Sequence, residues 1–157
     1  MLTVHASGGP AMLAAAHEAA SALTSAPKLL AVTVLTSMDA AQLASTGVDL
    51  PPGEQAMELG RLAYSSGIRG LVASGAEVSR LRTAYPDVTL VIPGIRPGGA
   101  SAGDQKRVAT PAAAIAAGAD YLVLGRPITR AADPAAAAQA ILDEIASTTA
   151  PEPSYRA

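Results

Sequence analysis

Apolar and polar residues alternate along this chain in blocks that predict strands and helices in strict succession. Five short apolar runs, rich in valine, isoleucine and leucine, predict strands, and the stretch after each strand has the composition and spacing of a helix. The predicted strands are residues 2–5, 29–35, 70–74, 89–92 and 121–124. The predicted helices are residues 10–22, a short helix from residue 39, and residues 54–66, 76–85, 111–118 and 134–147.

Residues with preferred positions at helix ends support these boundaries. Asp39, Thr110 and Asp133 stand just before predicted helices and are expected to be N-caps. Proline follows two of them at the first helical position, where its missing N–H group is tolerated. Gly67 and Gly118 follow predicted helices and are expected to end them.

The strand–helix alternation predicts an α/β fold with parallel strands joined by right-handed crossovers. Two architectures compete, an open doubly wound sheet and a (β/α)8 barrel of the TIM type. The first strand leads into Ser-Gly-Gly-Pro at residues 7–10, which does not match the dinucleotide-binding pattern G-x-G-x-x-G. We therefore favour the barrel, here incomplete, with about five βα units where a full barrel has eight in roughly 250 residues.

The domain organisation expected from this pattern is simple. Residues 1–150 are expected to be the C-terminal part of one barrel domain, and residues 151–157 a flexible tail. Met1 stands directly against the first strand, which leads to the expectation that the chain begins partway through its fold.

Composition excludes several classes of function. The chain has 157 residues, 50% of them hydrophobic and 15% charged, which indicates a folded core. A net charge of −2 with no basic block gives no support for nucleic-acid binding. The absence of cysteine excludes disulfides, thiolate metal sites and a cysteine nucleophile. No apolar run is long enough for a transmembrane helix, so no membrane partner is expected and the cytoplasm is the predicted location.

Candidate chemistry gathers where the last two strands end. Arg96 follows Pro-Gly-Ile, Arg126 follows Gly125, and a polar loop containing Gly-Asp-Gln at residues 103–105 lies between them. An arginine fork matches phosphate oxygens, and a glycine beside it lets backbone N–H groups approach the same anion. Because a barrel binds phosphate near the ends of its last strands, the pattern predicts a phosphorylated small-molecule ligand. The simpler alternative for Arg126 is a surface ion pair.

Five short segments, in this order, resemble the orotidine 5′-phosphate decarboxylase family. They are Val-His-Ala-Ser-Gly-Gly at 4–9, Ala-Val-Thr-Val-Leu-Thr-Ser at 31–37, Pro-Gly-Ile-Arg at 93–96, Gly-Asp-Gln at 103–105 and Gly-Arg-Pro-Ile at 125–128. The resemblance covers roughly residues 1–147. It implies a (β/α)8 barrel that converts orotidine 5′-monophosphate to UMP and CO2 without metal or organic cofactor. The family commonly forms homodimers, so a homodimer is expected for the full-length protein.

The resemblance also implies roles for individual residues. Arg96, Gly125 and Arg126 resemble the phosphate-binding residues. Gln105 resembles the loop glutamine that reaches from the phosphate toward the pyrimidine. Thr36 resembles the hydroxyl residue at the pyrimidine edge, although a plain cap or turn is the alternative. His5, at the end of the first strand, is expected to make a structural hydrogen bond rather than to act in catalysis.

The family's catalytic D-x-K-x-x-D motif does not occur in these 157 residues. Lys28 precedes a strand and is expected to face the opposite end of the barrel, and Lys106 lies in the polar loop. We therefore expect no catalytic residue in this chain and little activity from it alone. Two other functions stay open: a related sugar-phosphate barrel enzyme, and a non-catalytic phosphate-binding half-barrel that pairs with another chain.

Overall fold

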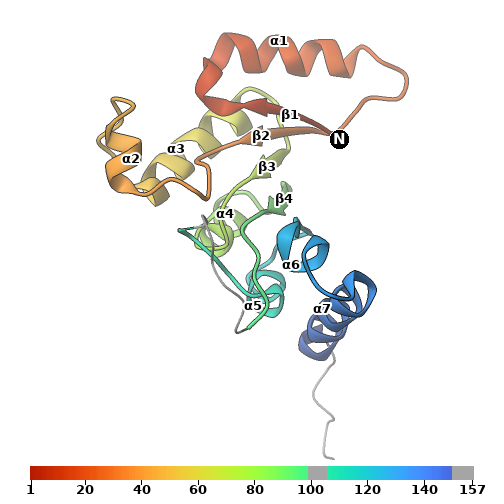
Figure 1. The fold of residues 1–157 in the computed structure, drawn as a ribbon. Helices are drawn as coiled ribbons and strands as arrows, with labels where there is room; N and C mark the ends of the chain where they lie inside the picture. Colours follow the sequence, from red (N-terminus) through yellow and green to blue (C-terminus); the bar gives the residue numbers. More distant parts are fainter. Residues whose placement is uncertain (99–105, 150–157) are drawn as a thin grey trace, which may run out of the picture.

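A single parallel sheet organises the computed structural model of this chain, which describes residues 1–98 and 106–149 (Figure 1). The strands pair in chain order, β1-β2-β3-β4-β5, and every pairing is parallel. They are β1 (Leu2–His5), β2 (Leu29–Val32), β3 (Gly70–Val72), β4 (Thr89–Ile92) and β5 (Tyr121–Leu122).

The helices follow the strands as predicted, with one addition. They are α1 (Gly9–Ser21), α2 (Ala40–Ala44), α3 (Pro52–Ser65), α4 (Val78–Ala84), α5 (Pro111–Ala116), α6 (Arg126–Thr129) and α7 (Pro134–Thr149), with a 3-10 turn η1 (Ala6–Gly8) before α1. The short helix α6 was not predicted, because four residues are too few to display a helical period. The expected tail at residues 151–157 lies outside the described residues.

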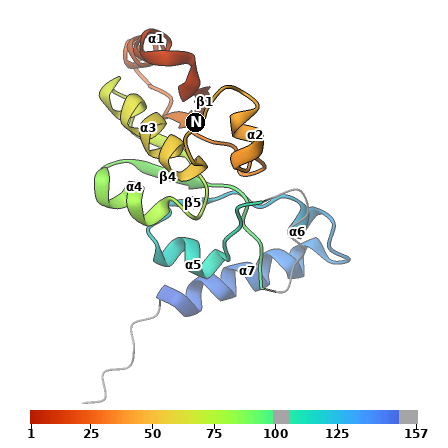
Figure 2. The same cartoon turned by 90° about the vertical axis from the view of Figure 1, so that its left-hand side faces the viewer.

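The strand order decides between the two architectures. A doubly wound sheet reverses its strand order at a switch point, whereas this sheet never reverses. The helices follow the same progression, since α1 contacts α3 and α3 contacts α4, as Figure 2 shows from top to bottom. The sheet is therefore five strands of barrel wall, and the prediction of a (β/α)8-type fold is confirmed over these residues.

The predicted helix ends are also confirmed. Asp39 accepts a hydrogen bond from the Gln42 amide (2.9 Å) in a capping box, and Thr110 and Asp133 each cap the helix that follows them. Gly67 takes the left-handed conformation (φ 88°) after α3, which a side chain would strain.

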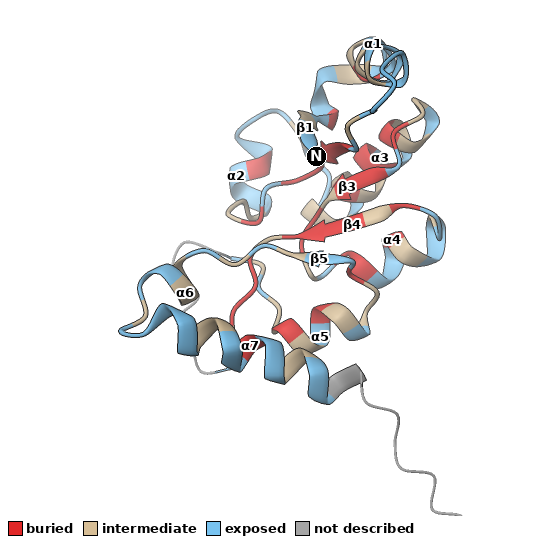
Figure 3. Cartoon of the chain, turned by 90° about the vertical axis from the view of Figure 1, so that its right-hand side faces the viewer, coloured by how far each residue is buried: buried red, intermediate tan, exposed pale blue. Residues whose placement is uncertain are grey.

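The core lies between the sheet and its helices. Leu71 of β3 and Leu90 of β4 are paired in register, and both are fully buried. Figure 3 shows the same central strands as the most buried part of the sheet, whereas β1 at the edge is largely exposed. No helix in the described part of the chain has the length and apolar character needed to cross a membrane. This packing holds the carboxyl ends of the strands rigidly, and the candidate site lies there.

Candidate functional site

The two predicted phosphate-binding arginines occupy equivalent positions beyond neighbouring strands. Ile92 of β4 pairs with Leu122 of β5, and the pairing continues through a hydrogen bond from the Val123 amide to the Ile92 carbonyl (2.9 Å). Arg96 and Arg126 each lie four residues beyond this pair. The register therefore brings both arginines to the same edge of the sheet.

Arg96 is buried, and among the described residues it has no carboxylate partner. The residue is only 9% exposed, and its Nη1 donates to the carbonyl of Ile95 (2.8 Å). Its backbone amide donates to the carbonyl of Ala109 (2.9 Å). The ion pairs formed among the described residues do not include Arg96. Since a buried charge is costly unless it is paired, Arg96 is suited to binding an anion.

Gly125 and Arg126 form the beginning of α6. Arg126 is half-buried, and Gly125 is exposed. A Cβ atom placed on Gly125 would meet no heavy atom within 4 Å, so the space in front of this residue is open. A small polar group can therefore approach the backbone at Gly125 closely.

Thr36 lies in the turn after β2, beside a small cavity. The residue is 7% exposed, and its carbonyl accepts hydrogen bonds from the amides of Lys106 (3.1 Å) and Arg107 (3.4 Å). Thr36 and Pro93 help to line a cavity of about 260 Å³ whose other walls are residues of β2, β3 and the turns that follow them. This cavity is a mostly apolar chamber with a hydroxyl residue at its wall, a combination suited to a flat polar ring.

The remaining candidate residues differ in where they lie in the chain. Gln105, with the rest of Gly-Asp-Gln, lies outside the described residues. Lys106 is exposed and pairs with Asp39 (2.5 Å), and Lys28 donates to Thr89, the first residue of β4 (2.7 Å). Lys28 therefore faces the amino ends of the strands, as predicted. In the described part of the chain, no group of three or more residues could hold a metal ion.

Among the described residues, His5 does not make the structural hydrogen bond that was expected. It is exposed at the end of β1 and lines a second cavity of about 360 Å³ between β1, β2 and the helices beyond them. Within the described residues its side chain makes no hydrogen bond. His5 is not part of the candidate site.

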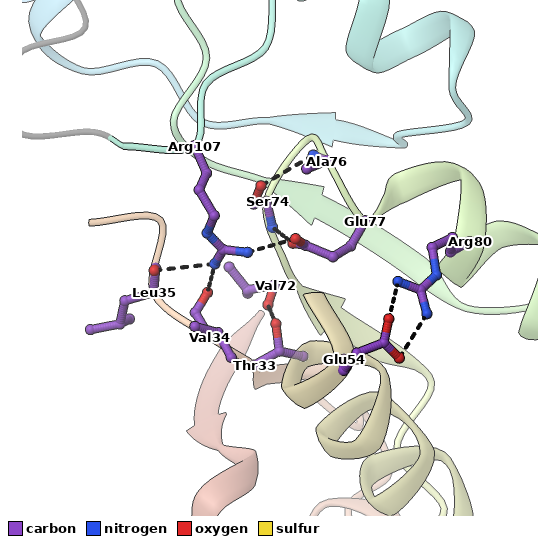
Figure 4. A network of polar contacts seen from close by, with 10 residues as sticks. All are labelled: Thr33, Val34, Leu35, Glu54, Val72, Ser74, Ala76, Glu77, Arg80 and Arg107. Atoms are coloured by element: carbon purple, nitrogen blue, oxygen red, sulfur yellow. Dashed lines mark hydrogen bonds and ion pairs between the residues drawn. The ribbon is translucent and has the colours of Figure 1, made fainter. Parts of the chain in front are cut away.

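A buried ion pair beside the site was not predicted from the sequence, and Figure 4 shows it from close by. Arg107 Nη1 donates to Glu77 Oε1 (2.6 Å), and the two side chains are 13% and 4% exposed. Burial raises the pKa of Glu77, and the neighbouring Arg107 opposes this shift. The two residues are 30 positions apart, so no local spacing could have revealed the pair.

A parallel sheet in sequential order, with its polar residues at the carboxyl ends of the strands, defines the class of (β/α)8-barrel proteins. Within this class, the family model described as "Orotidine 5′-phosphate decarboxylase / HUMPS family" matches residues 1–141. The chain belongs to this family, as its five sequence segments predicted.

Relatives agree with this assignment. The chain is 53% identical over 152 residues to the orotidine 5′-phosphate decarboxylase of Gluconobacter oxydans, covering 94% of this chain and 64% of that protein. It is 55% identical over 143 residues to the one of Dichelobacter nodosus, covering 90% and 62%. A crystal structure of orotidine 5′-phosphate decarboxylase from Lactobacillus acidophilus is 39% identical, with a TM-score of 0.75, and covers 92% and 63%. The chain thus spans less than two thirds of the length of these relatives.

Proposed function

We propose that this chain takes part in the decarboxylation of orotidine 5′-monophosphate to UMP, and that it contributes the phosphate and pyrimidine contacts. The observation that carries the proposal is Arg96, a buried cation that has no carboxylate partner in the described part of the chain, at the same register as Arg126. Relatives that share about half of its residues carry the name of this enzyme.

In this proposal each site residue has one role. Arg96 and Arg126 bind the phosphate of the nucleotide through charge-assisted hydrogen bonds, which are roughly twice as strong as neutral ones. Gly125 leaves room for the phosphate oxygens. Thr36 contacts the edge of the pyrimidine, which enters the cavity beside Pro93. Gln105 reaches from the phosphate toward the pyrimidine.

The chemistry also needs groups that these 157 residues lack. Loss of CO2 leaves a carbanion on the ring, which an ammonium group can both stabilise and protonate. The D-x-K-x-x-D motif that would supply the ammonium group does not occur in this sequence, and Lys28 faces the wrong end of the strands. The phosphate contacts supply binding energy that the rest of the site can use at the reacting carbon. We therefore propose that this chain alone binds the nucleotide weakly and turns over little or nothing.

The proposal includes an assembly and a location. Residues 1–150 belong to one barrel domain, and the complete enzyme is a homodimer. Its place is the cytoplasm, because a doubly charged phosphate ester does not cross a membrane unaided. No nucleic acid or membrane takes part.

A binding experiment on the 157-residue chain tests this function. UMP and 6-substituted UMP analogues should raise its melting temperature more than ribose 5-phosphate does, because only the nucleotides fill both the phosphate site and the cavity. Stabilisation by ribose 5-phosphate equal to that by UMP would favour a sugar-phosphate enzyme. No stabilisation by any phosphate would contradict a phosphate site.

A reconstitution experiment tests the catalytic part of the proposal. The chain alone is expected to show no measurable release of CO2 from orotidine 5′-monophosphate. Mixed with the portion of the Gluconobacter oxydans relative that lies outside the matched region, it should gain activity, and Arg96→Ala should remove that gain. Full activity of the 157-residue chain by itself would refute the assignment of catalysis to groups outside it.

A further inference from the structure

The segment that begins at Lys106 is held between the two halves of the candidate site. On one side, the amides of Lys106 and Arg107 donate to the carbonyl of Thr36. On the other side, Ala109 forms a parallel bridge with Ile95, and its carbonyl accepts from the amide of Arg96 (2.9 Å). Residues 106–109 therefore connect the turn that carries Thr36 with the loop that carries Arg96.

The side chain of Arg107 anchors this connecting segment through hydrogen bonds to the turns after β2 and β3. Its Nη2 donates to the carbonyls of Val34 (2.9 Å) and Leu35 (3.2 Å), and its Nη1 donates to Glu77 (2.6 Å) (Figure 4). One guanidinium thus joins the end of β2 to the turn after β3. A lysine could not reproduce this fork of donors.

Glu77 is itself fixed by the turn after β3. Its Oε2 accepts from the amide of Ser74 (3.0 Å), and the hydroxyl of Ser74 accepts from the amide of Ala76 (3.1 Å). Gly75 in this turn lets the connecting segment approach, because a Cβ atom there would lie 2.4 Å from the Cβ of Ala109. Charge, hydrogen bonds and close packing therefore act on the same segment.

We propose that the buried Glu77–Arg107 pair is a positioning device that sets Thr36 and Arg96 at a fixed separation, so that the pyrimidine and phosphate ends of one nucleoside monophosphate are bound together. This inference rests on the proposed function, which assigns those two residues to the two ends of the nucleotide. Neither Glu77 nor Arg107 needs to touch the ligand. They hold the two binding residues at the separation that suits one nucleotide. A ligand that carries base and phosphate together then binds more tightly than either part does alone.

The test compares a double variant with a matched control. Glu77→Gln/Arg107→Gln removes both buried charges together, which avoids leaving one of them unpaired. Glu54→Gln/Arg80→Gln makes the same changes in the ion pair of α3 and α4, whose side chains are about half exposed (Figure 4). UMP, uridine and inorganic phosphate are titrated into each chain and followed by NMR.

For the pair at Glu77 and Arg107, UMP affinity should fall about tenfold or more, the scale of coupling between two sites. The affinities for uridine and for inorganic phosphate should change less than twofold, and the control should match the wild type for all three ligands. UMP binding equal to the wild type would overturn the proposal. An equal loss for UMP and phosphate would also overturn it, since that is the result of general unfolding.

A ligand-free measurement separates this inference from the proposed function. In the double variant, hydrogen exchange at the amides of Lys106 and Arg96 should become at least about tenfold faster, while the core amide of Leu90 keeps its protection. If the wild-type chain binds no UMP, the proposed function fails, and exchange alone then decides whether the pair fixes the segment. Unchanged exchange at Lys106 would overturn the positioning role.

Discussion

Arg96 and Arg126 lie at matching positions beyond neighbouring strands, each four residues after the paired residues Ile92 and Leu122. They differ in their surroundings: Arg96 is buried at 9% exposure, whereas Arg126 is half-buried at the start of α6. A buried guanidinium is already desolvated and oriented, so it loses little on binding an anion. The more exposed one can adjust to the ligand. We expect the two arginines to contribute unequally to one phosphate site.

The first prediction concerns Arg96. Arg96→Met should lower UMP affinity by about 10- to 100-fold, because a hydrogen bond to a charged group contributes roughly 1.5–3 kcal/mol. The ligand-free chain should keep its free energy of unfolding within about 1 kcal/mol, or gain stability, because an apolar side chain replaces a buried charge that pairs with no carboxylate of residues 1–98 or 106–149. Titration calorimetry and urea denaturation measure the two quantities.

Arg82→Met is the matched control for this prediction. Arg82 binds the carbonyls of Gly118, Pro86 and Val88 and the carboxylate of Asp120 near the amino ends of the strands. Its loss should cost about 2–3 kcal/mol of stability and leave UMP affinity unchanged in the folded chain. The opposite pattern, stability lost at Arg96 and binding lost at Arg82, would contradict the assignment of the anion site.

The second prediction concerns Gly125. Gly125→Ala adds a methyl group where no heavy atom lies within 4 Å, at a negative φ of −108°. Stability should therefore stay within about 0.5 kcal/mol, whereas UMP affinity should fall because the methyl group enters the space used by the phosphate. Gly53→Ala in α3 is the control, since its nearest atom is at 3.7 Å and no ligand is expected there. Equal UMP affinity in both variants would place the phosphate elsewhere.

The third prediction concerns the contact between Gly75 and Ala109. Gly75→Ala should destabilise the chain by about 1–3 kcal/mol, the usual cost of overpacking, because the two Cβ atoms would lie 2.4 Å apart. It should also weaken UMP binding by displacing the connecting segment. Adding Ala109→Gly should restore both properties in part. If Ala109→Gly restores neither stability nor UMP affinity, the chain relieves the clash in another way than by displacing Ala109.

The fourth prediction is a pH dependence caused by Glu77. Burial raises its pKa above the ordinary value of 4.5, so the folded chain holds this proton more tightly than the unfolded chain. The resulting stabilisation is complete below pH 4.5 and is lost as the pH rises through the raised pKa. The unfolding free energy of the wild type minus that of Glu77→Gln should therefore fall as the pH rises from 4.5 upward. Urea denaturation at a series of pH values measures this difference, and one that rises with pH would contradict the direction of the shift.

The burial that raises the pKa of Glu77 is relevant to why the Glu77–Arg107 pair is present. Replacing a buried ion pair by well-packed apolar side chains is often neutral or stabilising, so the burial of Glu77 and Arg107 is weak evidence for a stabilising role. A positioning role explains the presence of the pair better than a stabilising role does. The exposed pair of Glu54 and Arg80 needs no such explanation, since it lies in water on the helices.

The order of the helices and strands and the ends of the helices could be predicted from the sequence, because the residue patterns that set them extend over only a few residues. Asp39, Thr110 and Gly67 mark helix ends by their own hydrogen bonds and dihedral angles, and these were confirmed. The strand ends were predicted less well: β2 was expected to reach residue 35 and ends at Val32. The apolar run continues because Val34 packs into the core from the turn, so hydrophobicity alone could not separate strand from turn.

Contacts between distant segments could not be predicted in the same way. The join between Arg107 and Glu77, or between Ala109 and Gly75, depends on how the loop after β4 folds back over the turn after β3. No sequence pattern near the residues of either pair indicates these contacts. The resemblance to a family predicted roles for Thr36, Arg96 and Arg126 from their motifs, whereas the contact between Glu77 and Arg107 became visible only in the fold.

The last prediction concerns the two outer strands of the sheet. In the described residues β1 pairs only with β2, and β5 pairs only with β4, so each has an edge of backbone groups open to another strand. Leu2, Tyr121 and Val123 on these strands or just beyond them are about half exposed. Because open apolar edges recruit further strands, the 157-residue chain should self-associate in a concentration-dependent way, as light scattering would measure. Val123→Lys should reduce this association, whereas Leu142→Lys, on the exposed face of α7, should not. If both variants associate like the wild type, the strand edges are not the contact, and the half-barrel does not assemble through them.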